Sequence, residues 1–268
     1  MLLREVEYAK PSSVSEALDL LAANDGARAL AGGQTLLNVM KARAASPDAL
    51  IDLNGLEELA GIELAADGTL TIGAMTTYAE VIGSAEAKAR PILGEVCATI
   101  ADVQVRNRGT IGGNICSNDP TNHLPPLMAA VGARMTIAGA NVMEREVAAE
   151  EFFLGVYLTA VGPGELLTRI TIPAGKGDGF AAVTLGADGT CIVSAAASVG
   201  DGVRVALGCV DAVPVVLQPE SAEEDAVRAA VAGAGLQPPA DVHASSEYRA
   251  HLAEVLAVRA ARQAAERA

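Results

Sequence analysis

Two double-glycine segments carry the residues of this chain that could hold a charged ligand. The first reads Ala31-Gly32-Gly33-Gln34-Thr35 and the second Thr110-Ile111-Gly112-Gly113-Asn114. Glycine lets backbone approach a ligand closely and turn through positive φ. A hydroxyl residue at a helix start adds free N–H groups that attract an anion. Together the segments could hold the two phosphates of one dinucleotide from opposite sides. The alternative is that each pair is an ordinary turn.

Neither segment matches a single-loop phosphate-binding fingerprint. GxGxxG and GxxxxGK[ST] are both missing from the sequence, so a phosphate bound here would be held in another way. No GxSxG elbow, nucleophile–base pair or pair of acid–base carboxylates stands out either. The sequence therefore indicates binding chemistry rather than catalytic side chains, as expected where a cofactor carries the electron chemistry.

Composition excludes several other classes of function. The formal net charge of −14 argues against nucleic-acid binding, which needs clustered Lys and Arg. It does not argue against binding of a dinucleotide, because distant charges are screened by salt. Local backbone amides with Arg106 or Arg108 would decide whether the phosphates bind. A hydrophobic content of 51% excludes a disordered chain. The sequence shows no signal-peptide pattern and no apolar run of transmembrane length, which predicts a cytoplasmic protein.

The cysteines and histidines form no pattern typical of a metal site. No CxxC motif or iron–sulfur spacing occurs among the four cysteines, Cys97, Cys116, Cys191 and Cys209. Each lies among apolar residues, as a small buried thiol would. No HExxH or paired spacing occurs among the three histidines, His123, His243 and His251. We therefore expect no disulfide, cluster or metal in this chain.

Predicted helices and strands flank the glycine segments. A helix is expected at 12–24. Ser12 or Ser13 can cap its N-terminus, and Glu16 lies three residues after Ser13, the spacing of a capping box. The second glycine pair is expected as a turn, followed by a helix that Pro125 and Pro126 open. The other expected elements are helices at 35–43, 76–83 and 86–104 (broken near Pro91), and strands at 29–31, 49–52, 62–64, 70–73, 133–138 and 166–172.

A domain boundary is predicted at 173–179, where glycine, proline and charge cluster. It divides the chain into domains at 1–174 and 178–268. The second domain is expected to be a small α+β unit, because antiparallel strands precede helices in it. Its predicted strands are 181–185, 191–199 and 203–210, and its predicted helices are 220–234 and 245–265.

Longer stretches of the sequence resemble one family, the FAD-binding medium subunits of molybdenum hydroxylases. They are VEYAKPSSVSEALDLLAAN, AGGQTLLNVMKAR, LTIGAMTTYAEV, VRNRGTIGGNICSNDPTNHLPPLMAAVGA and GELLTRITIP. That family includes xanthine dehydrogenases and aerobic carbon monoxide dehydrogenases. The resemblance covers most of the chain and fades after Pro173. It implies an α+β fold: a two-lobed FAD-binding domain (PCMH, or vanillyl-alcohol-oxidase-like) with the dinucleotide between its lobes, then a smaller C-terminal α+β domain.

The resemblance also implies FAD contacts at both glycine segments. The first segment, Ala31 to Thr35, would meet the pyrophosphate from one side, and the second, Thr110 to Asn114, from the other. Leu30 and Leu36 would line the cofactor. Leu167 would contact the adenine or the isoalloxazine; the alternative is a core strand residue.

The sequence departs from the pattern of the relatives in two places, at His123 and at the stretch with Ala182 and Thr184. His123 stands where relatives often carry Asp, and histidine can accept or donate a hydrogen bond to FAD; otherwise it is a structural residue at a helix start. Asp119 would be a cofactor contact or would cap the turn before Pro120. Many relatives have an aromatic residue and a lysine near the flavin where this chain has Ala182 and Thr184, which leaves Phe180 as the candidate to cover the ring.

The function that the resemblance implies is electron transfer within a complex. A large partner subunit would hold the molybdenum cofactor and oxidise the substrate, and a small one would carry two [2Fe–2S] clusters, in a dimer of heterotrimers. The FAD of this chain would pass electrons to an external acceptor: NAD, a quinone or oxygen. Two alternatives stay open, a self-sufficient flavoprotein oxidase, which would need its own acid–base residue, and a non-catalytic nucleotide-binding or scaffold module.

Overall fold

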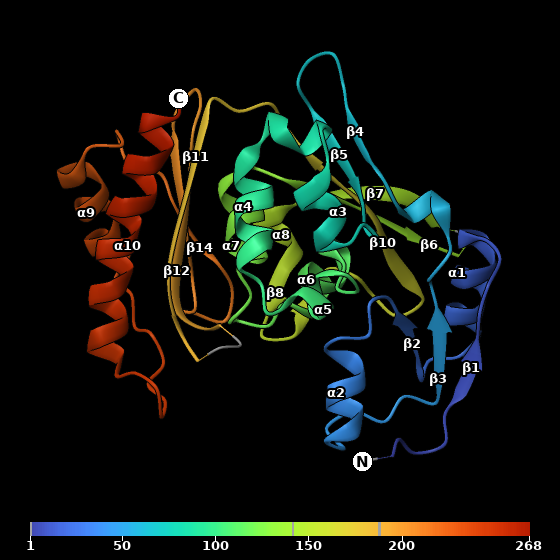
Figure 1. Cartoon of the computed structure of the whole chain (residues 1–268). Coiled ribbons are helices and arrows are strands. Elements are labelled where there is room, and N and C mark those ends of the chain that lie inside the picture. Colours follow the sequence, from blue (N-terminus) through green and yellow to red (C-terminus); the bar gives the residue numbers. More distant parts are fainter. Residues whose placement is uncertain (1, 141, 187–188) are drawn as a thin grey trace.

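The chain folds into successive layers of sheets and helices, coloured from blue to red in Figure 1. The computed structural model describes residues 2–140, 142–186 and 189–268. Along the sequence, a three-stranded sheet is followed by a five-stranded and then a four-stranded sheet, each packed against helices. The predicted α+β fold is confirmed. In the described ranges, none of the helices is both long enough and apolar enough to span a membrane.

The N-terminal layer is a parallel sheet in the order β1-β3-β2. Its elements are β1 (Glu7–Ala9), α1 (Val14–Ala23), β2 (Ala27–Leu30), α2 (Leu36–Lys41) and β3 (Ala49–Asp52). Ser13 caps α1 by accepting from the Glu16 N–H, while the Glu16 carboxylate accepts from the backbone N–H and the hydroxyl of Ser12. Residues of α1 and this sheet join Ala138 and Leu166 of the five-stranded sheet in the smallest of the three apolar clusters among the described residues.

The central layer is an antiparallel sheet in the order β4-β5-β10-β6-β7. Its strands are β4 (Ile62–Leu64), β5 (Leu70–Gly73), β6 (Arg134–Gly139), β7 (Val142–Ala148) and β10 (Glu165–Ile172). The largest apolar cluster joins this sheet to the central helices. Those helices are α3 (Tyr78–Gly83), α4 (Pro91–Thr99), α5 (Val103–Arg106), α6 (Ile111–Ser117), α7 (Leu124–Ala130) and α8 (Ala149–Phe152), with 3-10 turns at Glu57–Leu59 and Glu86–Ala89.

The C-terminal layer is an antiparallel sheet in the order β11-β12-β13-β14. Its elements are β11 (Gly177–Leu185), β12 (Thr190–Val199), β13 (Val203–Gly208), β14 (Val215–Leu217), α9 (Glu224–Gly233) and α10 (Ser246–Glu266). Helix α10 packs on the outer face of the sheet and α7 contacts β12 and β13 from the inner side (Figure 1). A buried ion pair, Arg90 Nε to Asp178 Oδ2 at 2.6 Å, joins the start of α4 to β11.

A short hairpin carries exposed apolar side chains beside the central layer. It consists of β8 (Phe153–Gly155) and β9 (Leu158–Thr159), paired antiparallel. Leu154, Val156, Tyr157 and Leu158 are all exposed. The Asn118 side-chain amide donates to the Gly155 oxygen at 2.7 Å, which fastens the hairpin to the end of α6.

Most predicted elements exist, and one prediction at the glycine segments was wrong. The second glycine pair is not a turn: Gly112 and Gly113 lie in the first turn of α6, which Thr110 caps. The predicted strand at 29–31 begins earlier, at Ala27, and the strand at 181–185 begins at Gly177. The sequence analysis missed the short strands β1, β8, β9 and β14, the edge strand β7, and the short helix α8.

Candidate functional site

The two glycine segments, far apart in sequence, pack directly against each other. A Cβ atom placed on Gly32 would collide with the backbone oxygen of Arg108, and one placed on Gly113 would lie 3.7 Å from the Ala31 Cβ. The N-terminal layer supplies the first segment, between β2 and α2, and the central layer supplies the second. The fold therefore brings the two segments to one place, as a ligand shared between them would require.

The first segment presents a run of unused backbone donors. Gly33 has φ +73, a conformation that glycine adopts without strain. Within the described residues, the N–H groups from Gly32 to Leu36 have no acceptor; the next one, of Leu37, donates to the Gly33 oxygen at 3.1 Å. Successive free N–H groups form a concave site that suits phosphate oxygens. The first segment thus has the donors that its predicted role needs.

The second segment differs, because its backbone donors are already used inside the chain. The N–H groups of Ile111 and Gly112 donate to the Thr76 and Ala74 oxygens, both at 2.9 Å. Those of Gly113 and Asn114 donate to the hydroxyl and the carbonyl of Thr110, at 3.0 and 3.1 Å. The expectation of free N–H groups was therefore wrong for these four residues. What the segment offers a ligand is the Thr110 hydroxyl hydrogen and the Asn114 side chain.

Asn114 has an unsatisfied polar atom in this region. The residue is largely buried, and in the described structure its Oδ1 has no hydrogen-bond partner. A buried carbonyl oxygen without a partner is costly, so a donor from a ligand or water would stabilise it. Together with the free donors of the first segment, it shows that this region fits a polar ligand.

Three residues that sequence reasoning missed, Asn54, Asp52 and Tyr8, hold the first segment in place. The Asn54 side-chain amide donates to the Ala31 oxygen at 3.0 Å and to Asp52 Oδ1 at 2.5 Å. The Tyr8 hydroxyl donates to Asp52 Oδ2, also at 2.5 Å. Partial burial works against the charged form, but these hydrogen bonds outweigh it and lower the pKa of Asp52. The signal was weak, because an Asp-x-Asn at a strand end is a common turn pattern.

Asp119 is engaged within the chain. Its Oδ1 accepts from the Thr121 N–H at 2.9 Å and from the Thr121 hydroxyl at 2.8 Å, and its Oδ2 accepts from the Tyr157 hydroxyl at 3.0 Å. Asp119 therefore caps the turn that contains Pro120, and its role as a cofactor contact stays a prediction. Desolvation and then the Asp119 charge raise the pKa of Tyr157.

His123 and Phe180 pack against each other, although the domain boundary separates them in sequence. Their ring centroids lie 5.2 Å apart with the planes tilted by 58°. His123 stands at the start of α7, only 6% exposed, and Nδ1 is without a partner in the described structure. It makes no side-chain cap, so the helix start does not account for its ring. Ala182 and Thr184 lie further along β11, with Thr184 exposed.

The leucines predicted to line a cofactor have different surroundings. Leu167 is buried in the largest apolar cluster and pairs with Ile137, next to an irregularity in the ladder of β10. Its side chain therefore packs in the core, and a contact between Leu167 and a cofactor stays a prediction. Leu30 and Leu36 are partly exposed beside the first glycine segment, and Leu30 Cδ1 lies 3.3 Å from where a Cβ on Gly33 would stand.

The two arginines near the second segment have different surroundings. Arg106 donates to the oxygens of Ile100 and Ala101, at 2.9 and 2.8 Å, so its charge is held at the start of α5. Arg108 is exposed, and its backbone touches Gly32. Arg108 is thus the cation of the two with a side chain free to turn toward an anion.

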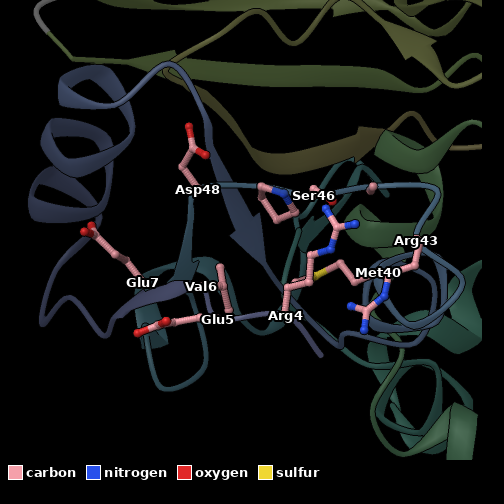
Figure 2. A pocket seen from close by; sticks show the side chains of 10 residues that line it. Arg4, Glu5, Val6, Glu7, Met40, Arg43, Ser46 and Asp48 are labelled. Carbon is pink, nitrogen blue, oxygen red and sulfur yellow. The ribbon is translucent and has the colours of Figure 1, made fainter. Parts of the chain in front are cut away.

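A cavity of about 400 Å³ lies beyond the other end of α2, between the N-terminal residues and the loop before β3. Figure 2 shows Arg4, Arg43, Glu5 and Asp48 around it. All of its charged residues are exposed and both signs are present. It therefore lacks the buried, convergent polar groups that mark a ligand site.

The cysteines and histidines do not form a metal centre in the described part of the chain. No group of three His, Cys, Asp or Glu side chains gathers there as ligands would. All four cysteines are free thiols. Neither do the described residues near the glycine segments place a general base beside a nucleophile. The arrangement is suited to holding a phosphorylated ligand with backbone and amide groups.

A family model described as the FAD-binding domain in molybdopterin dehydrogenase matches residues 4–175. Two of the curated relatives match over nearly their full lengths. The carbon monoxide dehydrogenase medium chain of Afipia carboxidovorans is 37% identical, covering 100% of this chain and 99% of the relative. The glyceraldehyde dehydrogenase medium chain of Sulfolobus acidocaldarius is 32% identical, covering 97% and 99%.

Solved structures show the same fold over the whole chain. A chain of the reconstituted CO dehydrogenase from Oligotropha carboxidovorans superposes with a TM-score of 0.93 at 35% identity, covering 100% of both chains. A chain of quinoline 2-oxidoreductase from Pseudomonas putida superposes with a TM-score of 0.91 at 33% identity, covering 99% of each. These likenesses extend beyond the residues that the family model matches.

Proposed function

Because this chain belongs to the family of FAD-binding domains in molybdopterin dehydrogenases, we propose that it is the electron-transfer medium subunit of a molybdenum hydroxylase. Its partners would be a small subunit with two [2Fe–2S] clusters and a large subunit with the molybdenum cofactor, assembled as a dimer of heterotrimers. The full-length match to medium chains supports this proposal, since those relatives are named as parts of larger assemblies. Bound FAD would take electrons from the clusters and give them to an external acceptor.

The observation that carries the proposal is the convergence of the two glycine segments with free donors on one of them. The N–H groups from Gly32 to Leu36 would hold phosphate oxygens of FAD. The Thr110 hydroxyl would add a donor from the opposite side, and Asn114 Oδ1 would accept from the ligand. Asn54 and Asp52 would position the first segment through Ala31. His123 and Phe180 would form part of the pocket wall.

FAD binding is tested by releasing the flavin from the isolated chain. Acid precipitation should leave FAD in the supernatant, because backbone and amide donors hold it without a covalent bond. Flavin in the pellet would contradict the non-covalent site. A chain that stays colourless after incubation with FAD would favour a scaffold module over both flavin functions.

Electron transfer is tested by following flavin bleaching in stopped flow. The isolated chain should be reduced by dithionite but by no organic substrate, because it provides binding groups and no acid–base pair. In the assembled complex, the substrate of the large subunit should bleach the same band. Substrate-driven reduction of the isolated chain would support a self-sufficient oxidase instead.

We also propose that the chain is organised as two domains, at 1–174 and 178–268. The ends of the matched region and the start of the C-terminal sheet at Gly177 support this division. Limited proteolysis should cut first near Gly175 or Lys176, which are exposed. Equal cutting throughout the chain would contradict it.

A further inference from the structure

Two buried thiols lie together at one end of the C-terminal sheet. Cys191 is near the start of β12 and Cys209 directly follows its antiparallel neighbour β13. The Cys209 sulfur lies 3.6 Å from the Cys191 backbone oxygen and 2.8 Å from the Pro120 oxygen. The residues are 2% and 6% exposed, and neither thiol is in a disulfide. The pair is therefore shielded from solvent and close enough for the two side chains to interact.

Buried polar groups without partners surround this pair. In the described ranges, His123 Nδ1, Ser194 Oγ and Arg249 Nε make no hydrogen bond. Ser194 and His123 adjoin the Cys191 thiol, and an Arg249 guanidinium nitrogen lies 3.4 Å from the Cys209 oxygen. Unpaired donors in an apolar core are costly. A thiolate at Cys191 would give the Ser194 hydroxyl and the His123 ring an acceptor.

The pKa values of the two thiols shift in opposite directions. The neighbouring Cys209 thiol, with smaller effects from His123 and Ser194, lowers the pKa of the Cys191 thiol despite its burial. The same interaction with Cys191 raises the pKa of Cys209. Cys97 provides the contrast, because burial alone raises its pKa to about 12. A thiolate beside a neutral thiol is the arrangement in which one sulfur attacks an oxidant and the other resolves the product.

The backbone at Cys209 is strained. Its φ is +63, a region that L-residues other than Asn and Asp rarely adopt. Glycine would satisfy this conformation at lower cost. A cysteine held there, with its sulfur against the Pro120 oxygen, is an outlier of the kind that gathers at functional positions.

We propose that Cys191 and Cys209 form a reversible dithiol–disulfide pair that hydrogen peroxide oxidises. The Cys191 thiolate attacks one peroxide oxygen, the O–O bond breaks, and a sulfenic acid forms while the departing hydroxide takes up a proton and leaves as water. The Cys209 sulfur then attacks the Cys191 sulfur; the S–O bond breaks, and a second water leaves with the Cys209 proton. The thiols lose two electrons and the peroxide gains them. This inference does not depend on FAD.

Peptide mapping of the full chain after hydrogen peroxide treatment tests the pair. The expected product is a Cys191–Cys209 cross-linked peptide, lighter by two hydrogen atoms and restored by dithiothreitol. Cys97 should stay reduced as the internal control. An aromatic disulfide reagent, too bulky for the buried site, should not label the pair in the folded chain. Cys191 and Cys209 that stay reduced as long as Cys97 would overturn the proposal.

A variant separates the attacking thiol from the resolving one. Cys209→Gly removes the second thiol and suits the positive φ, so the fold should be retained. Peroxide should then leave a sulfenic acid on Cys191 that dimedone traps. Cys191→Ala should give no adduct at Cys209. A dimedone adduct at Cys209 in Cys191→Ala, or none at Cys191 in folded Cys209→Gly, would contradict the assigned roles.

Discussion

The glycines of the two segments are required for different physical reasons. At Gly32 a side chain would strike the backbone of Arg108, and at Gly112 a Cβ would lie 2.6 Å from the Ala74 oxygen. These two positions let parts of the chain approach each other. At Gly33 the reason is conformational, because φ is +73. A substitution at Gly33 should therefore change both the backbone conformation of the first segment and the direction of its free N–H groups.

Replacing Gly33 should separate flavin binding from folding when it is compared with a matched control. Gly33→Ala should lower the free energy of unfolding by about 1–2 kcal/mol, the cost of a left-handed L-residue. Gly235→Ala should cost as much, since Gly235 has φ +59 and open space around it. Only Gly33→Ala should weaken FAD binding, by roughly ten-fold or about 1.4 kcal/mol, as its N–H groups turn away. Equal affinities in titration calorimetry would remove Gly33 from the site.

Asp52 predicts a pH dependence of stability. Its pKa is lower in the folded chain than in the unfolded one, so its contribution is complete above about pH 4 and is lost as the pH falls through the folded value. Urea unfolding should therefore show a smaller loss of stability between about pH 5 and pH 3 for Asp52→Asn than for the wild type. Tyr8→Phe, which removes one hydrogen bond to the carboxylate, should lie between them. Three parallel curves would contradict this role.

At the scale of elements, the cap of α6 links folding to the site. Thr110 and Thr77 both cap helices, α6 and α3, by accepting from an N–H three residues later. Thr110→Ala and Thr77→Ala should each cost about 1 kcal/mol of stability. Only Thr110→Ala should also weaken FAD binding, because it removes a hydroxyl donor. If Thr77→Ala weakens FAD binding as much, helix stability rather than the hydroxyl would be responsible.

Local patterns predicted most of the elements, and the failures share a cause. The strands β3, β4 and β5 were predicted to the residue, since clear apolar runs end at turns. The second glycine pair was taken for a turn because glycine is a poor helix former. Tertiary contacts override that propensity: close packing on Ala74 needs glycine inside α6. The short strands β1 and β14 carry too few residues for a pattern.

The glycine segments could be found in the sequence. Which of the two has free backbone N–H groups could not. Which N–H groups are free depends on partners such as Thr76 and Ala74, which come from another part of the chain. The same holds for Asn54, whose contact with Ala31 crosses from one strand end to the next. The thiol pair was also missed. Cys191 and Cys209 lie beyond the paired residues of the β12–β13 hairpin, so its Gly200-Asp201-Gly202 turn does not indicate that the two thiols meet.

At the scale of the molecule, one buried ion pair joins the central helices to the C-terminal sheet. Arg90 and Asp178 are 2% and 6% exposed, and Arg90 also donates to the Pro173 oxygen at 2.6 Å. Arg90→Ala should lower the free energy of unfolding by about 3–5 kcal/mol, because it leaves a buried carboxylate uncompensated. The exposed pair Arg134–Glu146 is the control, and Arg134→Ala should change stability by less than about 0.5 kcal/mol. Similar losses of unfolding free energy in the two variants would show that burial of the ion pair does not determine its effect on stability.

The N-terminal layer packs through the smallest apolar cluster, which it shares with Ala138 and Leu166 of the central sheet, and the first glycine segment leaves that layer to meet the second. A ligand that touches both segments would therefore connect the N-terminal layer, which packs on the smallest apolar cluster, to the central layer, which contains the largest one. Its binding energy would be added to the cost of opening the N-terminal layer alone. Amide hydrogen exchange should thus slow most in β1, β2 and β3 when FAD is added, and least in α10. Bound cofactor would therefore determine how often the N-terminal layer opens away from the central layer.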